Sequence, residues 1–131
     1  MTFLLDTHTL LWWLEGSSKL GPQANAVISN PKSGVWISAA TAWEIAIKAG
    51  LGRLDLGEPP EVCLPRELAR SGFLPLPVTF EHALAVRSLP LHHADPFDRM
   101  LVAQALSEGL AIMTTDAAIS EYNVPTIDAS R

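Results

Sequence analysis

The fold is first indicated by the stretch Thr2-Phe3-Leu4-Leu5-Asp6, an unbroken apolar run that ends in an acidic residue. Such runs are typical of strands buried on both faces, as in parallel sheets. The residues that follow, Thr7 to Glu15, have helical character and stop at Gly16. The sequence therefore opens with a buried strand that leads directly into a helix.

Strands and helices continue to alternate along the chain. We expect further strands at 35–37, 73–76, 110–113 and 124–127, and helices at about 21–29, 39–49, 61–71, 81–87, 96–108 and 117–122. Ser38 is a natural N-cap for the helix at 39–49, and Pro75 restricts its strand to a place near a sheet edge. The pattern predicts an α/β fold, a short central parallel sheet between two helical layers in a three-layer α/β/α sandwich.

Length and composition predict one folded domain over residues 1–131. The hydrophobic fraction of 48% and charged fraction of 18% exclude a disordered chain and suggest that a partner covers some of the surface. Cys63 is the only cysteine, so no intramolecular disulfide can form. The first apolar stretch has no basic flank and is interrupted by Asp6 and His8, so we expect a cytoplasmic protein without signal peptide or membrane span.

Four acidic residues lie at or just beyond the ends of apolar runs, or within the first turns of expected helices: Asp6, Glu44, Asp98 and Asp116. In a parallel α/β fold, strand ends and helix starts converge on one edge of the sheet, where ligands bind. Carboxylates gathered there repel one another unless a cation joins them, and hard oxygen ligands suit Mg²⁺ or Mn²⁺. The sequence therefore predicts a metal site for phosphodiester chemistry.

The formal net charge of −5 argues against a general nucleic-acid binder, which would normally carry a basic surface. Four of the negative charges belong to the four acids, which leaves −1 for the rest of the chain. Two bound Mg²⁺ ions would offset these four carboxylates. A nuclease is thus compatible with the charge, whereas tight metal-free binding to nucleic acid is not.

Each of three acids also has a purely structural interpretation. Asp6 and Asp116 each precede an expected helix and could serve as N-caps. Glu44 lies too deep in its helix for capping, but Lys48 follows four residues later and could form an ordinary ion pair with it. The same type of position, repeated along the chain, favours the metal-ligand interpretation for the set.

Asp95 and Asp98 compete for one role in the motif Asp95-Pro96-Phe97-Asp98. Asp95 is well placed as the N-cap, with the proline at the first helical position. Asp98 stands a full turn further on, and one cap is enough for one helix. We therefore expect Asp95 to cap the helix and Asp98 to be the metal-ligand candidate of the two.

Several other residues carry weaker signals. The hydroxyl of Thr114 could hold a water or a phosphate oxygen, and Arg99 and Lys48 could contact a scissile phosphate or be solvated or ion-paired. His92 and His93 are adjacent and lie in an expected loop, so both cannot easily reach one metal. For this pair we expect a packing role rather than ligation.

The adjacent pair Trp12 and Trp13 bears on partners. Neighbouring residues of a helix point about 100° apart, so both can hardly enter one core. One of them is a candidate anchor for a dimer or partner surface. The alternative is that both are shielded at the two margins of a buried stripe.

The chain resembles a PIN-domain protein over essentially its whole length, and is especially similar to bacterial VapC-type toxins of toxin–antitoxin pairs. The resemblance rests on the ordered segments Leu4–His8, Ile37–Ala39, Trp43–Lys48, His92–Ala105 and Thr114–Asp116. It implies a PIN-like α/β/α sandwich with endoribonuclease activity that depends on Mg²⁺, or on Mn²⁺ as a substitute. It also implies a homodimer, an inhibitory antitoxin and a possible hetero-oligomer with that antitoxin on operator DNA.

The resemblance assigns the acidic cluster to the same four acids, Asp6, Glu44, Asp98 and Asp116, with Asp95 as a possible accessory. Asp6 and Asp98 would be the principal ligands, while Glu44 and Asp116 complete or orient the shell. Hydrolysis would use water activated by one or two divalent ions, so no side-chain nucleophile is needed. The absence of a Gly-x-Ser-x-Gly elbow and of a Walker motif is consistent with this chemistry.

Three alternatives use similar residues. A Mg²⁺-dependent phosphatase with an aspartyl nucleophile would favour a second Asp two places after Asp6, but that position is His8. A phosphorylated receiver-like module would need a late lysine, and none follows Lys48. A PIN-fold RNA-binding or regulatory module without toxin activity remains open, although the intact acidic set disfavours it.

Overall fold

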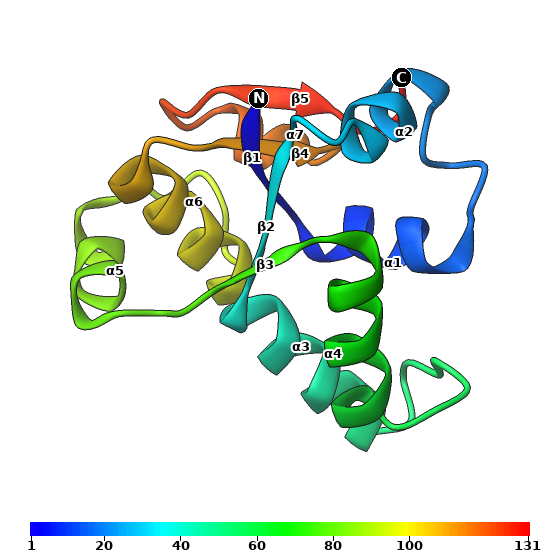
Figure 1. Ribbon diagram of the computed structural model, residues 1–131. Coiled ribbons are helices and arrows are strands. Elements are labelled where there is room, and N and C mark those ends of the chain that lie inside the picture. The colour runs from blue at the N-terminus through cyan, green and yellow to red at the C-terminus, as the bar shows by residue number, and fades with distance from the viewer.

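The computed structural model describes residues 1–131 and contains one parallel sheet in the order β3-β2-β1-β4-β5 (Figure 1). Its strands are β1 (Thr2–Leu5), β2 (Gly34–Ser38), β3 (Leu74–Leu76), β4 (Ala111–Thr114) and β5 (Thr126–Asp128). The central strand is β1, in which Leu4 is in register with Trp36 of β2 and Ile112 of β4. The carboxyl ends of β1, β2 and β4 therefore lie side by side.

The helices are α1 (Thr7–Glu15), α2 (Pro22–Ser29), α3 (Ala39–Gly50), α4 (Pro60–Ser71), α5 (Phe80–Ala85), α6 (Pro96–Glu108) and α7 (Ala117–Ser120), with a short 3₁₀ helix η1 (Val86–Ser88). Local capping explains most of their starts. The side chains of Ser38, Asp95 and Asp116 each accept a backbone N–H in the first turn of α3, α6 and α7. Gly16 and Gly109 end α1 and α6 in the left-handed conformation that glycine adopts at least cost.

Helices cover both faces of the sheet, as β1 illustrates. Phe3 and Leu5 point into one apolar core, which includes residues of α1, α2, α3 and α4. Leu4 points to the opposite face and packs in a second core with residues of α6 and α7. All three side chains have no exposed surface. The predicted three-layer α/β/α sandwich with a parallel sheet is therefore confirmed, and β3 lies at an edge as expected.

Some boundaries differ from the predictions. The helix expected at 81–87 is α5 followed by η1, and the helix expected at 117–122 ends at Ser120. Val124 precedes a proline and is thereby disfavoured from helical backbone. The last strand begins at Thr126 because Pro125 has no N–H, although its carbonyl accepts the N–H of Ile112 at 2.9 Å.

The two adjacent tryptophans are both half-buried against the first core, which agrees with the interpretation that both are shielded at its margins. Trp13 packs on Phe73 and donates its indole N–H to Ser71 Oγ at 3.0 Å. Trp12 lies next to His8 on α1. Cys63 is buried in α4. None of the helices combines the length and the apolar character needed to cross a bilayer.

Candidate active site

Asp6 lies at the end of the central strand and is almost fully buried. Its Oδ1 accepts the N–H of Thr9, which makes it the N-cap of α1, and its Oδ2 accepts the hydroxyl of Thr114 at 2.6 Å. Thr114 comes from the neighbouring strand β4, whose carboxyl end is adjacent to that of β1. The structural and functional interpretations of Asp6 are therefore compatible, because capping and Thr114 hold a buried carboxylate in one orientation.

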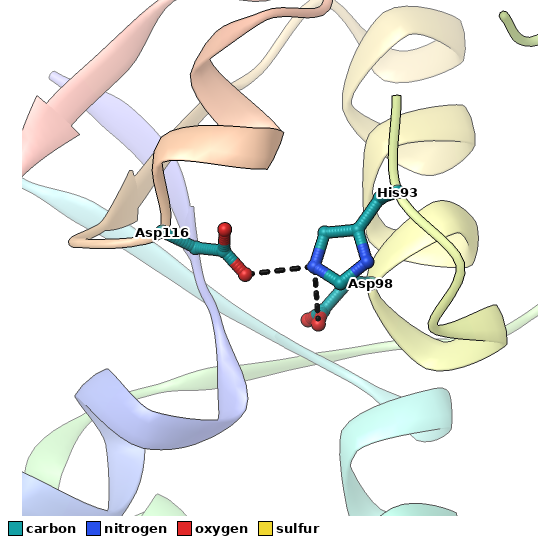
Figure 2. Close-up of side chains that lie close together, drawn as sticks. All are labelled: His93, Asp98 and Asp116. Carbon is teal, nitrogen blue, oxygen red and sulfur yellow. Dashed lines mark hydrogen bonds and ion pairs between the residues drawn. The ribbon is translucent and has the colours of Figure 1, made fainter. Parts of the chain in front are cut away.

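His93, Asp98 and Asp116 form the centre of the site (Figure 2). His93 Nε2 lies 2.7 Å from Asp116 Oδ2 and 3.2 Å from Asp98 Oδ2. One potential ligand atom from each residue falls within 4.8 Å of the other two. His93 lies in the loop before α6, Asp98 is the third residue of α6, and Asp116 lies two residues after the end of β4 as the N-cap of α7. Their meeting point is the carboxyl edge of the sheet, where the sequence placed the acids.

The electrostatics of Asp98 mark this edge as a concentration of negative charge. Burial raises the pKa of Asp98 to about 7, and the charges of Asp95, Asp6 and Glu44 contribute to the rise against the opposing effect of His93. Asp6 and Glu44 are thus within electrostatic range of Asp98, although only Asp98 and Asp116 of the four predicted acids belong to the close group. A carboxylate in such surroundings is stabilised by an added cation.

His93 and Asp116 form a hydrogen-bonded pair in which the pKa of the histidine is raised and the pKa of the carboxylate is lowered. For His93, burial favours a lower pKa, but the hydrogen bond and charge of Asp116 and the charges of Asp98 and Asp95 outweigh it and raise the pKa. For Asp116, burial is again outweighed, here by the hydrogen bonds from His93 and from the N–H of Ala118, so its pKa is lowered. His93 Nδ1 accepts the N–H of Asp95 at 3.0 Å, which leaves Nε2 to donate toward the carboxylates.

Glu44 is buried in α3, and both of its carboxylate oxygens have partners. Oε1 accepts the hydroxyl of Thr7 at 2.7 Å, and Oε2 lies 2.6 Å from Lys48 Nζ. The ion pair considered from the sequence is therefore present. Lys48 is bound to a site carboxylate rather than free for a phosphate.

Asp95 caps α6, since its Oδ1 accepts the N–H groups of Phe97 and Asp98 at 2.8 and 3.2 Å. This is the role expected for it. Its carboxylate lies outside the close group but still raises the pKa of Asp98. Asp95 thus affects Asp98 through its charge, and its role as an accessory ligand stays a prediction.

Arg99 occupies a different place from the one suggested by the sequence. Its guanidinium donates to the carbonyls of Val86, Leu89, Pro90 and His93 and to the hydroxyl of Tyr122. These bonds use the N–H groups of both terminal nitrogens. Arg99 therefore fastens the loop before α6 instead of reaching toward a substrate phosphate.

The sequence underrated His93. The argument that adjacent histidines cannot share a metal holds, but it leaves room for one of them. His92 packs edge-on against Tyr122, while His93 turns into the site and its N–H is held by the Tyr122 hydroxyl at 3.0 Å. The available signal was the position of this pair just before the helix that carries Asp98.

The donor set fits a divalent cation. It consists of carboxylate oxygens with one imidazole nitrogen, and Mg²⁺ and Mn²⁺ prefer oxygen ligands while imidazole is also acceptable to transition metals. Burial and the neighbouring acids disfavour the ionised form of Asp98, which an added cation would stabilise. The close group therefore offers a set of ligand atoms suited to a divalent cation.

Comparison with known proteins places the chain in a family. The PIN domain family matches residues 3–125. Ribonuclease VapC16 of Mycobacterium tuberculosis is 37% identical over 60 residues, an alignment that spans 46% of this chain and 43% of that protein. The chain thus matches less than half the length of this curated relative.

Solved structures share the fold at low sequence identity. VapBC2 from Rickettsia felis, bound to a DNA fragment from its promoter, has a TM-score of 0.71 at 13% identity, with 97% of this chain and 98% of that chain covered. A toxin–antitoxin complex from Klebsiella pneumoniae has a TM-score of 0.65 at 16% identity, with 97% of both chains covered. With a family match over nearly all its residues and this shared fold, the chain belongs to the PIN-domain family.

Proposed function

We propose that this protein is a divalent-metal-dependent endoribonuclease and the toxin of a toxin–antitoxin pair. The observation that carries the proposal is the meeting of His93, Asp98 and Asp116 at a sheet edge where burial and neighbouring acids raise the pKa of Asp98 to about 7. Membership of the PIN family and the similarity to a ribonuclease support the activity. Residues 1–131 would form a single PIN domain that acts in the cytoplasm.

The residues proposed for catalysis are Asp6, Glu44, Asp98 and Asp116, which would hold one or two Mg²⁺ or Mn²⁺ ions. When bound, such an ion supplies Lewis-acid activation of water and of the phosphoryl oxygens. Neighbouring residues orient these carboxylates and reduce their mutual repulsion. Thr114 orients Asp6 at the base of the cluster, and Lys48 limits the repulsion that Glu44 adds.

His93 is an additional proposed member of the site. Its imidazole lies between Asp98 and Asp116 and links the ends of α6 and β4. Its ring is oriented by the Asp95 N–H, and its backbone is fixed by the Tyr122 hydroxyl. This support keeps the two carboxylates at a constant separation despite their charges.

The toxin assignment is supported by the similar solved structures and by an apolar cavity between α3 and α4. The similar structures include complexes of toxins with antitoxins, one of them bound to promoter DNA. A cavity of about 830 Å³ between α3 and α4, lined by residues such as Ala46, Leu64 and Leu68, offers an apolar surface for a partner segment. We propose that the protein forms a homodimer that binds its cognate antitoxin, and that the complex binds operator DNA.

The test is cleavage of a panel of RNA and single-stranded DNA oligonucleotides with Mg²⁺, Mn²⁺ or EDTA. Metal-dependent cleavage of RNA is expected, with a loss of at least about 100-fold in Asp6→Asn. Glu15→Gln is the matched control, because it removes a carboxylate from an exposed position at the end of α1. Activity that survives both EDTA and Asp6→Asn would refute the mechanism, and folded, metal-loaded protein that cuts no RNA would contradict the activity.

The toxin role has its own readout. Expression of the wild-type chain in a bacterial host is expected to arrest growth, and Asp6→Asn is expected to restore it. If cells grow equally with both proteins at equal soluble levels, the toxin role is refuted, while nuclease activity is judged by the cleavage assay alone.

A further inference from the structure

A polar cavity of about 360 Å³ lies at the carboxyl ends of β4 and β5, the last two strands at one side of the sheet (Figure 1). Its walls contain no hydrophobic and no basic residue. They are formed by five hydroxyl residues and one carboxylate, namely Thr114, Thr115, Ser120, Thr126, Ser130 and Asp128. A molecule held in this cavity would be bound by hydrogen bonds rather than by apolar contact.

Thr114 joins the cavity to the acidic site. Its hydroxyl donates to Asp6 Oδ2 at 2.6 Å, and the same residue lines the cavity. In the sheet, Thr114 is in register with Asp128 of β5. The row continues to Asp6, whose N–H bonds to the carbonyl of Met113. Asp128 therefore lies two strand spacings, roughly 10 Å, from Asp6, so a strand of nucleic acid held at the acids can reach the cavity with a nearby nucleotide.

Asp128 is the only charged residue in the cavity walls. Its Oδ1 accepts the hydroxyl and the N–H of Ser130 at 2.6 and 2.9 Å. These two bonds lower the pKa of Asp128, so the carboxylate is ionised at neutral pH and can only accept hydrogen bonds. Its Oδ2 lies 3.5 Å from Arg131 Nε in an ion pair between two exposed side chains. Such pairs are weak, so this oxygen is available to a hydroxyl donor.

The cavity walls suit one part of a nucleotide better than the others. A phosphate is negatively charged and would be repelled by Asp128. A base has large apolar faces, for which the walls offer no aromatic or hydrophobic residue. A ribose is neutral, and its hydroxyls can donate to the carboxylate and exchange hydrogen bonds with the exposed Thr115 and Thr126. The cavity is therefore matched to the sugar.

We propose that this cavity binds the ribose of a nucleotide near the cleaved bond, and that Asp128 accepts a hydrogen bond from its 2′-hydroxyl. The proposal rests on the proposed ribonuclease function and adds to it a residue that distinguishes RNA from DNA. Deoxyribose lacks this hydroxyl and offers Asp128 no donor at the same place. RNA should therefore bind more tightly than DNA of the same sequence, and the difference should depend on Asp128.

Binding is measured in an Asp6→Asn background, so that the RNA stays intact, with short single-stranded RNA and DNA of one sequence in Mg²⁺. RNA is expected to bind at least about 10-fold more tightly than DNA, and adding Asp128→Ala should reduce this ratio to about threefold or less. Asp55→Ala is the matched control. Asp55 is also exposed and also accepts the N–H of the second residue after it, but it lies in the loop between α3 and α4.

The direction of the change separates recognition of the ribose from a general effect of charge. Removing a carboxylate reduces the repulsion of phosphates and should tighten the binding of RNA and DNA alike, which is the result expected for Asp55→Ala. Asp128→Ala should instead weaken the binding of RNA and leave that of DNA equal or tighter. If Asp128→Ala is unfolded in thermal melting, Asp128→Asn decides, because it keeps an oxygen for Ser130 and should still lower the RNA-to-DNA ratio.

A second readout locates the ribose along the strand. RNAs that carry a single 2′-deoxy or 2′-fluoro nucleotide at successive positions are compared. At one position both changes should weaken binding about 10-fold, because neither group can donate a hydrogen bond. The same two RNAs should lose nothing further with Asp128→Ala.

Other outcomes overturn the ribose site. An RNA-to-DNA ratio that is unchanged in Asp128→Ala, or a strand in which no single 2′-deoxy position matters, would refute it. A position that tolerates 2′-fluoro but not 2′-deoxy would show that sugar conformation, and not a hydrogen bond to Asp128, is recognised. Failure of the ribonuclease proposal is distinguishable, because the wild-type protein would then cut no RNA in Mg²⁺, whereas failure of the ribose site alone leaves RNA cleavage intact.

Discussion

Replacing Asp98 by asparagine is expected to stabilise the metal-free protein at pH 8 and to change its stability much less at pH 5. The substitution keeps the shape of the side chain and leaves an oxygen that can accept the His93 N–H. It removes a negative charge from a site where burial and three further acids oppose ionisation. The charge is therefore costly in the folded protein and harmless in the unfolded chain.

The magnitude follows from the pKa of Asp98, which is raised from 3.8 to about 7. Each pKa unit corresponds to about 1.4 kcal/mol, so the ionised form would be disfavoured by at most about 4 kcal/mol. The Asp98 side chain is 19% exposed, and solvent screens part of this interaction. We expect a net stabilisation of about 1–2 kcal/mol at pH 8, or about 3–10 °C in Tm for a chain of this size.

The pH dependence has a definite direction. Folding raises the pKa of Asp98, so the folded protein holds the proton more tightly than the unfolded chain does. The resulting stabilisation of the wild type is fully present below about pH 3.8 and is lost as the pH rises through about 7. The raised pKa of His93 acts in the same direction. At pH 5 Asp98 of the folded wild type is mostly protonated, so the difference in free energy of unfolding between Asp98→Asn and the wild type is much smaller than at pH 8.

The assay is thermal melting followed by circular dichroism in EDTA at pH 5 and pH 8. Glu15→Gln removes an exposed carboxylate and should leave Tm nearly unchanged at both. Saturating Mg²⁺ should raise Tm of the wild type at pH 8 by mass action, and raise it less in Asp98→Asn. A variant less stable than the wild type at pH 8 in EDTA, or a stabilisation equal at the two pH values, would refute the reasoning.

Three further substitutions test the support of the site. Thr114→Val removes the hydroxyl that orients Asp6 and should lower RNA cleavage about 10-fold with Mg²⁺ affinity also reduced; unchanged kinetics would contradict the orienting role. Arg99→Lys loses the two-nitrogen guanidinium group that holds the backbone carbonyls of segment 86–93. We expect it to lower the free energy of unfolding in urea by about 1–3 kcal/mol and to slow cleavage; a variant as stable as the wild type would contradict this holding role. Ser38→Ala removes the cap of α3 and the hydroxyl that donates to buried Gln104, and should cost about 1–3 kcal/mol in the same urea experiment; an equally stable variant would contradict this role.

The architecture could be read from local signals in the sequence. The apolar run of β1 indicates a strand buried on both faces, and the caps at Ser38 and Asp95 together with Gly16 and Gly109 mark helix ends. These signals depend on only a few neighbouring residues, so they can be recognised without knowing how the rest of the chain folds. These signals missed three boundaries: the end of α5, which continues as η1, the end of α7, and the start of β5, where Pro125 has no N–H to donate.

The positions of the acids could be anticipated in part. Because strand order and parallel pairing bring the carboxyl ends of β1 and β4 together, residues that follow these strands must be neighbours. Asp6 and Asp116 are such residues, and the assignment of capping to Asp95 and of an inward position to Asp98 followed from their places in the first turn of α6. Whether these acids are ligands and catalytic groups stays a prediction.

Contacts between residues far apart in the chain determined the rest. His93 enters the site because Arg99 and Tyr122 hold its loop, and Tyr122 lies 29 residues further along the chain. The raised pKa of Asp98 depends on burial and on charges from β1, α3 and the loop before α6. Thr114 and Asp128 line one cavity only because β4 and β5 pair in this register. Burial and electrostatics depend on distances in space, which local sequence patterns do not encode.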